Sequence, residues 1–325
     1  MLTRRQLLGT LAGGLLAAPL GTEAQTPTRL AKVGVLLYST PQADPNAAAL
    51  RESLRDLGYL EGRTLSFEYR FAEGKPERLP ALAEELAGLK PDVICSLGGD
   101  VTPSAQQATK TIPIVMVISN DPVQVGLVAS LARPGGNLTG VTFVLDALAG
   151  KRLALLKEAA PRITRVGILW NPDHADPEFR ENQRAARILG VQIQSLEVRR
   201  SEDFDAAFQA AGRERSEAII VVSSRLVNLQ TQRILDYAAK SRLPVIGDWG
   251  PLSRGGAVLS YGPNVAEMIQ RAATYVDRIL KGAKPGDLPI QQPTSFELVI
   301  NLKTAKALGL TIPQSLLQRA DQLIE

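Results

Sequence analysis

The chain has 325 residues, of which 45% are hydrophobic and 22% are charged, and its formal net charge is +4 at pH 7. This length suffices for two domains with cores of their own, and the composition excludes a disordered or fibrous protein. The 37 basic and 33 acidic residues are interspersed without a basic block, so nucleic acid is not an expected partner.

Residues 1–25 have the pattern of a secretory signal peptide. Arg4 and Arg5 precede an apolar run from Leu7 to Leu20, and the small residue Ala24 offers a cleavage site. The segment TRRQLL is compatible with twin-arginine export, so the Sec and Tat routes both stay open. Because no cysteine follows the apolar run, we do not expect a lipoprotein. We expect an exported protein, located in the periplasm if the host has an outer membrane.

From residue 30 onward, short apolar runs alternate with amphipathic stretches. The apolar runs predict strands over residues 32–38, 64–71, 91–97, 113–118, 139–143, 164–170, 191–198, 218–223, 244–249, 255–262 and 296–301. The stretches between them predict helices over residues 45–58, 76–89, 102–110, 121–136, 150–161, 177–190, 201–215, 226–242 and 265–282, and a short helix ending at Gly309. Nearly continuous apolar strands are typical of a parallel sheet covered by helices on both faces. The fold class predicted is α/β, with two doubly wound parallel-sheet lobes.

The alternation restarts near residues 142–148, which marks the boundary between the lobes. The tail after residue 262 is too small for a third domain, so we expect it to cross back and complete both lobes. The N-terminal lobe is predicted to comprise residues 30–143 plus 263–288, and the C-terminal lobe residues 144–262 plus 289–325. Several chain segments then form a hinge between them.

Polar and glycine residues follow many of the predicted strands. Open α/β sheets bind ligands beyond the carboxyl ends of their strands, so these residues are candidates for lining a crevice between the lobes. The alternative is that each one only caps a helix or forms a turn. The residues concerned are Ser39, Gly98, Gly99, Asp100, Thr102, Ser104, Ser119, Asn120, Asp121, Asn171, Ser223 and Asp248.

Five aromatic residues also lie at strand ends or near the joint between the lobes. They are Tyr38, Phe143, Trp170, Trp249 and Tyr261. Because aromatic residues form only 5% of the chain, this placement favours walls for a planar or apolar solute. The alternative is that the rings hold loops against the core.

Signatures of catalysis are few. The chain has no GxGxxG, P-loop, HExxH or GxSxG motif. The single histidine, His174, is expected in a solvated loop beside aspartates that cap a helix, and the single cysteine, Cys95, is expected in the core of a strand. We therefore expect no enzyme, no metal and no cofactor, with a secreted hydrolase using Asp100 or Asp121 as base as the alternative.

Several long segments closely resemble the bacterial ABC-transporter substrate-binding protein family that includes tryptophan-binding, TrpX-like members. They include TIPIVMVISNDPVQVGLVASLARPGGNLTGVT, GGAVLSYGPN and VDRILKGAKPGDLPIQQPTSFELVINLKTAKALGLTIPQSLL. The resemblance implies a type I periplasmic-binding fold whose lobes, joined by a three-strand hinge, close around a small solute and present it to a membrane permease. It places the cleft at Ser39, Asp100, Thr102, Asn120, Asp121, Ser223 and Asp248. The stretch SSRLVN departs from the TDN-like segment of the aromatic-amino-acid binders.

We therefore expect a monomeric, extracytoplasmic solute-binding component of an ABC importer, with an ABC permease as its membrane partner. Its ligand is expected to be a small organic solute that is amino-acid-like, or an aromatic or carboxylate compound, bound between the lobes. Besides the secreted hydrolase, a second alternative to this function is a ligand-sensing subunit of a membrane kinase. The predicted ligand contacts are Tyr38, Ser39, Gly99, Asp100, Thr102, Ser104, Asn120, Asp121, Phe143, Asn171, Ser223, Asp248, Trp249 and Tyr261.

Overall fold

The computed structural model describes residues 30–41, 44–143, 146–174 and 177–325. The predicted signal peptide, residues 1–25, lies outside the described residues. Within them, no helix has the length and apolar character needed to cross a membrane.

The first sheet contains five parallel strands. Helices lie on both of its faces, which explains why every residue of β3 and β4 is buried and why their sequences are almost wholly apolar. In spatial order the strands are β2 (Leu65–Phe71), β1 (Ala31–Leu37), β3 (Val93–Leu97), β4 (Ile114–Ile118) and β5 (Leu138–Thr142). The helices that follow these strands along the chain are α1 (Pro45–Asp56), η1 (Pro76–Arg78), α2 (Leu79–Gly88) and α3 (Thr102–Ala108).

The second sheet contains seven strands. All neighbouring pairs are parallel except β10 and β11, which pair antiparallel. In spatial order the strands are β12 (Gln322–Ile324), β11 (Glu297–Asn301), β10 (Leu259–Gly262), β9 (Val245–Gly247), β8 (Ala218–Val221), β6 (Arg165–Trp170) and β7 (Gln192–Glu197). The helices around them are α4 (Asp146–Ala159), α5 (Glu178–Leu189), α6 (Asp203–Arg213), α7 (Arg225–Leu229), α8 (Thr231–Ser241), α9 (Gly250–Arg254), α11 (Leu302–Ala307) and α12 (Gln314–Leu317). The two mostly parallel, helix-covered sheets confirm the predicted fold class.

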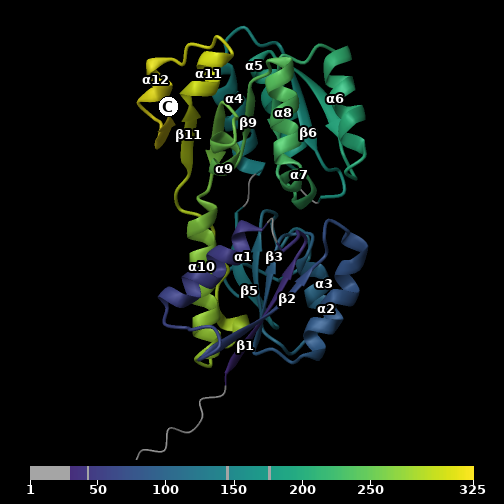
Figure 1. The fold of residues 1–325 in the computed structure, drawn as a ribbon, viewed down its shortest axis with the longest axis vertical. Coiled ribbons are helices and arrows are strands. Elements are labelled where there is room, and N and C mark those ends of the chain that lie inside the picture. The colour runs from purple at the N-terminus through teal and green to yellow at the C-terminus, as the bar shows by residue number, and fades with distance from the viewer. Residues whose placement is uncertain (1–29, 42–43, 144–145, 175–176) are drawn as a thin grey trace, which may run out of the picture.

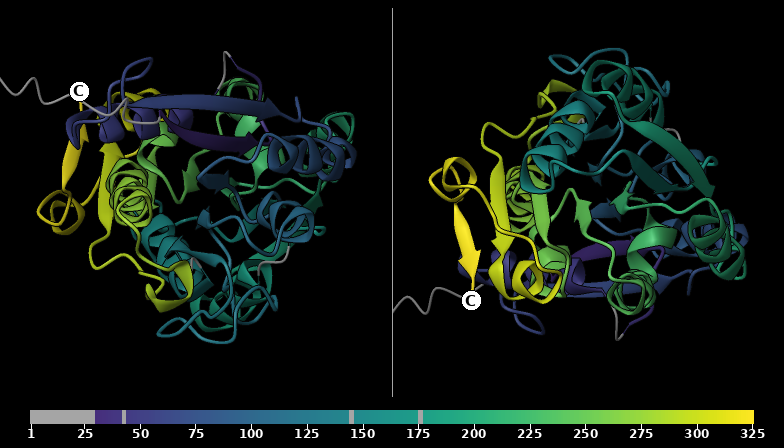
Figure 2. Two further views of the ribbon diagram at one scale, coloured as in Figure 1. Left: turned by 90° about the horizontal axis from the view of Figure 1, so that it is seen from below. Right: turned by 90° about the horizontal axis from the view of Figure 1, so that it is seen from above.

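The two sheets form separate lobes, stacked along the long axis of the molecule (Figure 1). The chain passes between them after β5, after β10 and before β11. Helix α10 (Val265–Leu280) follows a strand of the second lobe but belongs to the core of the first, where Met268, Ile269 and Val276 pack beside residues of β1, β3 and β4. Figure 2 shows α10 end-on beside the first lobe. After the short helix η2 (Pro285–Asp287), Gln291 forms a parallel β-bridge with Val141, a residue of β5.

The helix predicted over residues 121–136 is absent. These residues form a series of turns, so the prediction is wrong. The carboxylate of Asp121 accepts hydrogen bonds from the backbone N–H groups of Val123 (2.8 Å) and Gln124 (3.2 Å), the pattern of a helix N-cap, but no helix follows it. Gly126 then takes a φ of +76°, a left-handed conformation that ends any helical path.

Candidate functional site

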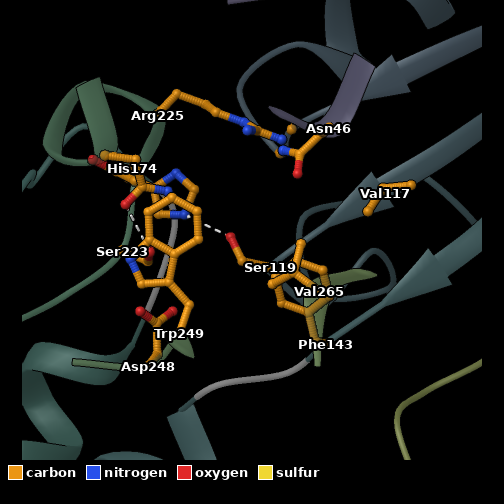
Figure 3. Close-up of a pocket in the computed structure, with 14 residues that line it drawn as sticks. Asn46, Val117, Ser119, Phe143, His174, Ser223, Arg225, Asp248, Trp249 and Val265 are labelled. Atoms are coloured by element: carbon orange, nitrogen blue, oxygen red, sulfur yellow. Dashed lines mark hydrogen bonds between the residues drawn. The ribbon is translucent and has the colours of Figure 1, made fainter. Parts of the chain in front are cut away.

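A cavity lies between the lobes, where the loops at the carboxyl ends of both sheets face each other (Figure 3). The space between its walls is about 520 Å³, part of which is open to solvent. The first sheet's lobe supplies Asn46, Gly98, Gly99, Val117, Ser119, Phe143 and, from α10, Val265. The second lobe supplies His174, Ser223, Ser224, Arg225, Asn228, Asp248 and Trp249. A neighbouring pocket shares Asn46, Arg225, Asn228 and Trp249, and adds Tyr38, Ser39, Asp44, Pro45 and Leu229.

His174 connects the two lobes across this cavity. It follows β6 in the second lobe, and its Nδ1 lies 2.6 Å from Oδ1 of Asp100, while its Nε2 lies 3.2 Å from the hydroxyl of Ser119. The residue is only 4% exposed, so the expectation of a solvated loop histidine is wrong. Asp100 and Ser119 follow β3 and β4 of the first sheet, which explains how a residue distant in sequence becomes enclosed.

Burial alone would raise the pKa of Asp100, but the facing His174 and Arg225 more than offset it. The pKa of this carboxyl therefore lies below its usual value, and the group also accepts the backbone N–H of Arg225. Asp100 is the only one of the sequence-predicted contacts that we find bound to two different residues of the opposite lobe among those the structure describes. Its carboxylate therefore links the two lobes through His174 and Arg225.

Asp248 is a buried carboxylate in the wall of the cavity. It follows β9, is 4% exposed, and its Oδ1 has no hydrogen-bond partner among the described residues. Burial raises the pKa of Asp248, with Arg152 and Ser223 acting in the opposite direction. Such a group is expected to gain a hydrogen-bond donor from whatever enters the cavity, because a buried acceptor without a partner costs free energy.

The aromatic side chains are distributed over three places. Trp249 and Phe143 line the cavity. Tyr38 lines the neighbouring pocket and donates its hydroxyl to the Gly74 carbonyl at 2.9 Å, and burial raises its pKa to about 12. Trp170 stacks on Phe179, with ring centroids 4.3 Å apart, in a separate surface groove. The rings are therefore shared between ligand-facing and purely structural positions.

Seven of the predicted contacts line one of the two pockets. Gly99, Phe143, Ser223, Asp248 and Trp249 face the cavity, and Tyr38 and Ser39 face the neighbouring pocket. The other seven line neither of them: Asp100, Thr102, Ser104, Asn120, Asp121, Asn171 and Tyr261.

Several of these seven side chains are occupied within their own lobe. The Thr102 hydroxyl lies 2.9 Å from that of Ser96 and donates to the Gly98 carbonyl at 3.0 Å, so it supports the loop from beneath. The Asn171 side chain accepts the N–H of Asp173 at 2.9 Å in a turn. The strand-end pattern thus included residues at the edge of each sheet that borders the cavity, but it did not separate residues that line the cavity from those that shape the loops.

Several residues that line the cavity were not among the ligand contacts predicted from the sequence, and they include Asn46, Val117, Ser119, His174, Ser224, Arg225, Asn228 and Val265. Arg225 and Asn228 lie in the first turns after β8, in the segment SSRLVN that the resemblance had singled out. Attention to the first turn after each strand end would have found them. Val265 had no such signal, because it reaches the cavity only through the return of α10 to the first lobe.

Among the described residues, no group of three or more His, Cys, Asp and Glu side chains is placed to hold a metal ion. Cys95 is buried in β3, as predicted, and burial raises its pKa to about 12. A thiol with that pKa is protonated at neutral pH and is a poor nucleophile.

Comparison with known proteins agrees with this architecture. The family model described as ABC transporter substrate binding protein matches residues 32–324. A tyrosine-binding protein from Clostridioides difficile (strain R20291) is 24% identical over 276 residues, which cover 84% of this chain and 79% of that protein.

Two solved structures have the same fold over most of the chain. A conserved domain protein from Vibrio cholerae is 31% identical, with a TM-score of 0.84, over 91% of this chain and 100% of that one. An ABC domain in complex with L-Trp from Streptococcus pneumonia is 24% identical, with a TM-score of 0.83, over the same shares of the two chains.

Proposed function

The chain belongs to the ABC transporter substrate-binding protein family, and from this premise we propose that it captures a small organic solute outside the cytoplasm and delivers it to a membrane permease for import. The observation that carries the proposal is the cavity between the lobes, in which a buried acceptor on Asp248 lies beside the indole of Trp249. Polar groups that fix orientation, set within an aromatic wall, are typical of small-molecule sites.

We infer that the solute is amino-acid-like and aromatic. Among the relatives, one is named for binding tyrosine and another was solved with L-Trp, which supports this class without fixing the compound. In our proposal, Trp249 and Phe143 contact the apolar part of the solute, and Asp248 and Ser223 contact its polar part. Tyr38, Ser39 and Gly99 are secondary contacts.

We propose that binding works by closure of the lobes. Solute groups that touch both lobes stabilise the closed form, so binding shifts the population toward it. The hydrogen bonds from His174 to Asp100 and Ser119 exist only when the lobes meet, and they add to that stabilisation. The two parts of the chain that move are the lobes predicted from the sequence, with boundaries near residues 143, 262 and 288.

A secreted hydrolase is the less favoured function. Asp100 and Asp121, the two candidate bases, line neither pocket, and both carboxylates accept hydrogen bonds that shape loops or hold the lobes together. The family is one of solute-binding proteins, and we propose that this member binds without turnover. We further propose a periplasmic monomer that carries no cofactor and is exported by the segment over residues 1–25.

The test is to purify the full chain without refolding, record its native mass spectrum, and identify by mass spectrometry any solute released on denaturation. Titration calorimetry with L-tyrosine, L-tryptophan and the released compound then measures affinity. We expect one solute per chain and no chemical change after prolonged incubation. A modified product, or a solute whose binding is unaffected by changes in the cavity wall, would contradict the proposal.

A further inference from the structure

We propose that Arg225 is the residue that selects an anionic group on the bound solute, and that it does so only when the lobes are closed. This inference rests on the proposed function and deepens it, because it assigns one end of the cavity to one chemical class. The class is a carboxylate or a similar anionic oxygen group, placed at the Arg225 end and not at the Asp248 end.

Within the described parts of the chain, the Arg225 guanidinium forms no ion pair, although it lies near enough to Asp100 to lower the pKa of that carboxyl. The Arg225 side chain is half-buried and lines both the cavity and the neighbouring pocket. Among the described residues, its guanidinium makes no salt bridge within 4.0 Å and no hydrogen bond. The nearby Asp100 carboxylate accepts the backbone N–H of Arg225 and pairs with His174 instead. A partly dehydrated guanidinium in this position favours an anion, which it can bind through two parallel hydrogen bonds.

The Arg225 side chain packs against Gly98 of the opposite lobe. Gly98 follows β3 with a φ of +139°, and a Cβ atom built there would lie 2.6 Å from the Arg225 Nε and 3.3 Å from its Cγ. A glycine is therefore required for the side chain to lie where it does. Because Gly98 and Arg225 belong to different lobes, this contact forms on closure, and anion selection is coupled to closure.

The other end of the cavity has the opposite preference. Figure 3 shows Arg225 reaching toward Asn46 on one side of the Trp249 indole, with Asp248 on the other side. The Asp248 carboxyl has an acceptor oxygen without a partner among the described residues, so it favours a hydrogen-bond donor on the solute. Together the two groups set the direction of the solute: the anionic end toward Arg225, the hydrogen-bond donor toward Asp248.

The test compares matched acids and amides on the full chain. The probes are L-tyrosine, L-tryptophan, their carboxamides, and tryptamine, which lacks the carboxylate altogether; inorganic phosphate tests whether a free anion suffices. We expect Arg225→Gln to weaken binding of the acids about tenfold to a hundredfold, as for a lost hydrogen bond to a charged group, and to change binding of the amides about twofold or less. Arg225→Lys should give an intermediate loss, because it keeps the charge without the paired donors.

The matched control is Arg233→Gln on α8, which removes the same charge from a residue that pairs with Asp205 and lines neither pocket. It should leave all affinities unchanged. Equal losses for acids and amides in Arg225→Gln, or no loss for either, would overturn the inference. Tight binding of phosphate alone would overturn the assignment to one end of an organic solute.

Coupling to closure is tested with Gly98→Ala. The added methyl group should weaken acid binding strongly in the wild-type background and only mildly in Arg225→Ala, which lacks the Cγ, Cδ and Nε atoms that the methyl group would meet. Circular dichroism and the unfolding midpoint show whether Gly98→Ala folds; if it does not, the acid-to-amide ratio in Arg225→Gln decides the inference alone. If no probe binds wild-type protein and no solute co-purifies, the proposed function itself fails, and this inference falls with it. If acids bind wild type and Arg225→Gln equally, only this inference fails.

Discussion

Burial of the single carboxyl group of Asp248 makes the free energy of unfolding depend on pH. Burial raises its pKa in the folded chain above the value in the unfolded chain. The protonated form therefore contributes stability that is fully present below the unfolded pKa, near 4, and is lost as the pH rises through the folded pKa. An asparagine at this position does not titrate.

We expect Asp248→Asn to gain free energy of unfolding relative to wild type as the pH rises from 4 to 8, in the absence of solute. Urea unfolding followed by circular dichroism at several pH values measures the difference. Asp236→Asn, at an exposed position on α8, is the control for the same chemical change outside the cavity. A constant difference for Asp248→Asn would mean that its carboxylate is well solvated in the folded chain.

Trp249 is the aromatic side chain expected to contribute most to affinity. It is partly buried and lines both pockets, and truncation of a tryptophan that contacts a ligand commonly costs about 2 kcal/mol or more. We expect Trp249→Ala to weaken binding of the co-purified solute by about thirtyfold in calorimetry. Trp170→Ala, which removes a ring stacked on Phe179 outside the cavity, should bind normally. Wild-type affinity in Trp249→Ala would remove this residue from the site.

For single residues, the sequence indicated the position along a strand, but it did not indicate whether a side chain points into the cavity or into its own lobe. It placed Cys95 in the core and Asp248 at a strand end, because both depend on local pattern. It failed for His174, because the partners of this residue lie in the other lobe and no local spacing indicates them. Arg225 did lie near a strand end, but its contact with Gly98 joins distant segments and has no local signal.

Helix α10 is the element on which the first lobe depends most. Ile269 is fully buried in the core formed with β1, β3 and β4, although the helix follows the sheet of the other lobe. We expect Ile269→Ala to lower the free energy of unfolding by about 2–5 kcal/mol, the usual cost of such a cavity. Gln270→Ala, at the exposed neighbouring position, should change it by about 0.5 kcal/mol or less. Equal effects in chemical denaturation would show that α10 does not seal this core.

Most elements could be predicted from the sequence because apolar runs and helical spacing are local signals. One exception, over residues 121–136, has a local cause too, because Gly126 adopts a left-handed conformation that turns the chain away from a helical path. The order of strands in each sheet and the return of α10 could not be predicted from spacing, because they are decided by packing between segments far apart in the chain.

For the whole molecule, the bonds made by His174 predict how easily the lobes close. His174→Ala removes two hydrogen bonds between the lobes, each contributing about 1 kcal/mol. Affinity for the co-purified solute should fall about tenfold to a hundredfold. Small-angle scattering of the solute-free variant should give a larger radius of gyration than wild type.

Ser119→Ala provides the graded comparison, because it removes only the 3.2 Å contact and keeps the bond between His174 and Asp100. Its affinity should lie between those of wild type and His174→Ala. If His174→Ala binds and scatters like wild type, the contacts across the cavity do not stabilise the closed form.

The late position of α10 in the chain also has a consequence for biosynthesis. The strands of the first sheet emerge from the ribosome well before residues 265–280, so the apolar surface that α10 covers stays open while the second lobe is being made. A nascent chain interrupted before residue 265 would present that surface to any chaperone. The first lobe therefore completes its folding only after most of the second lobe has been synthesised.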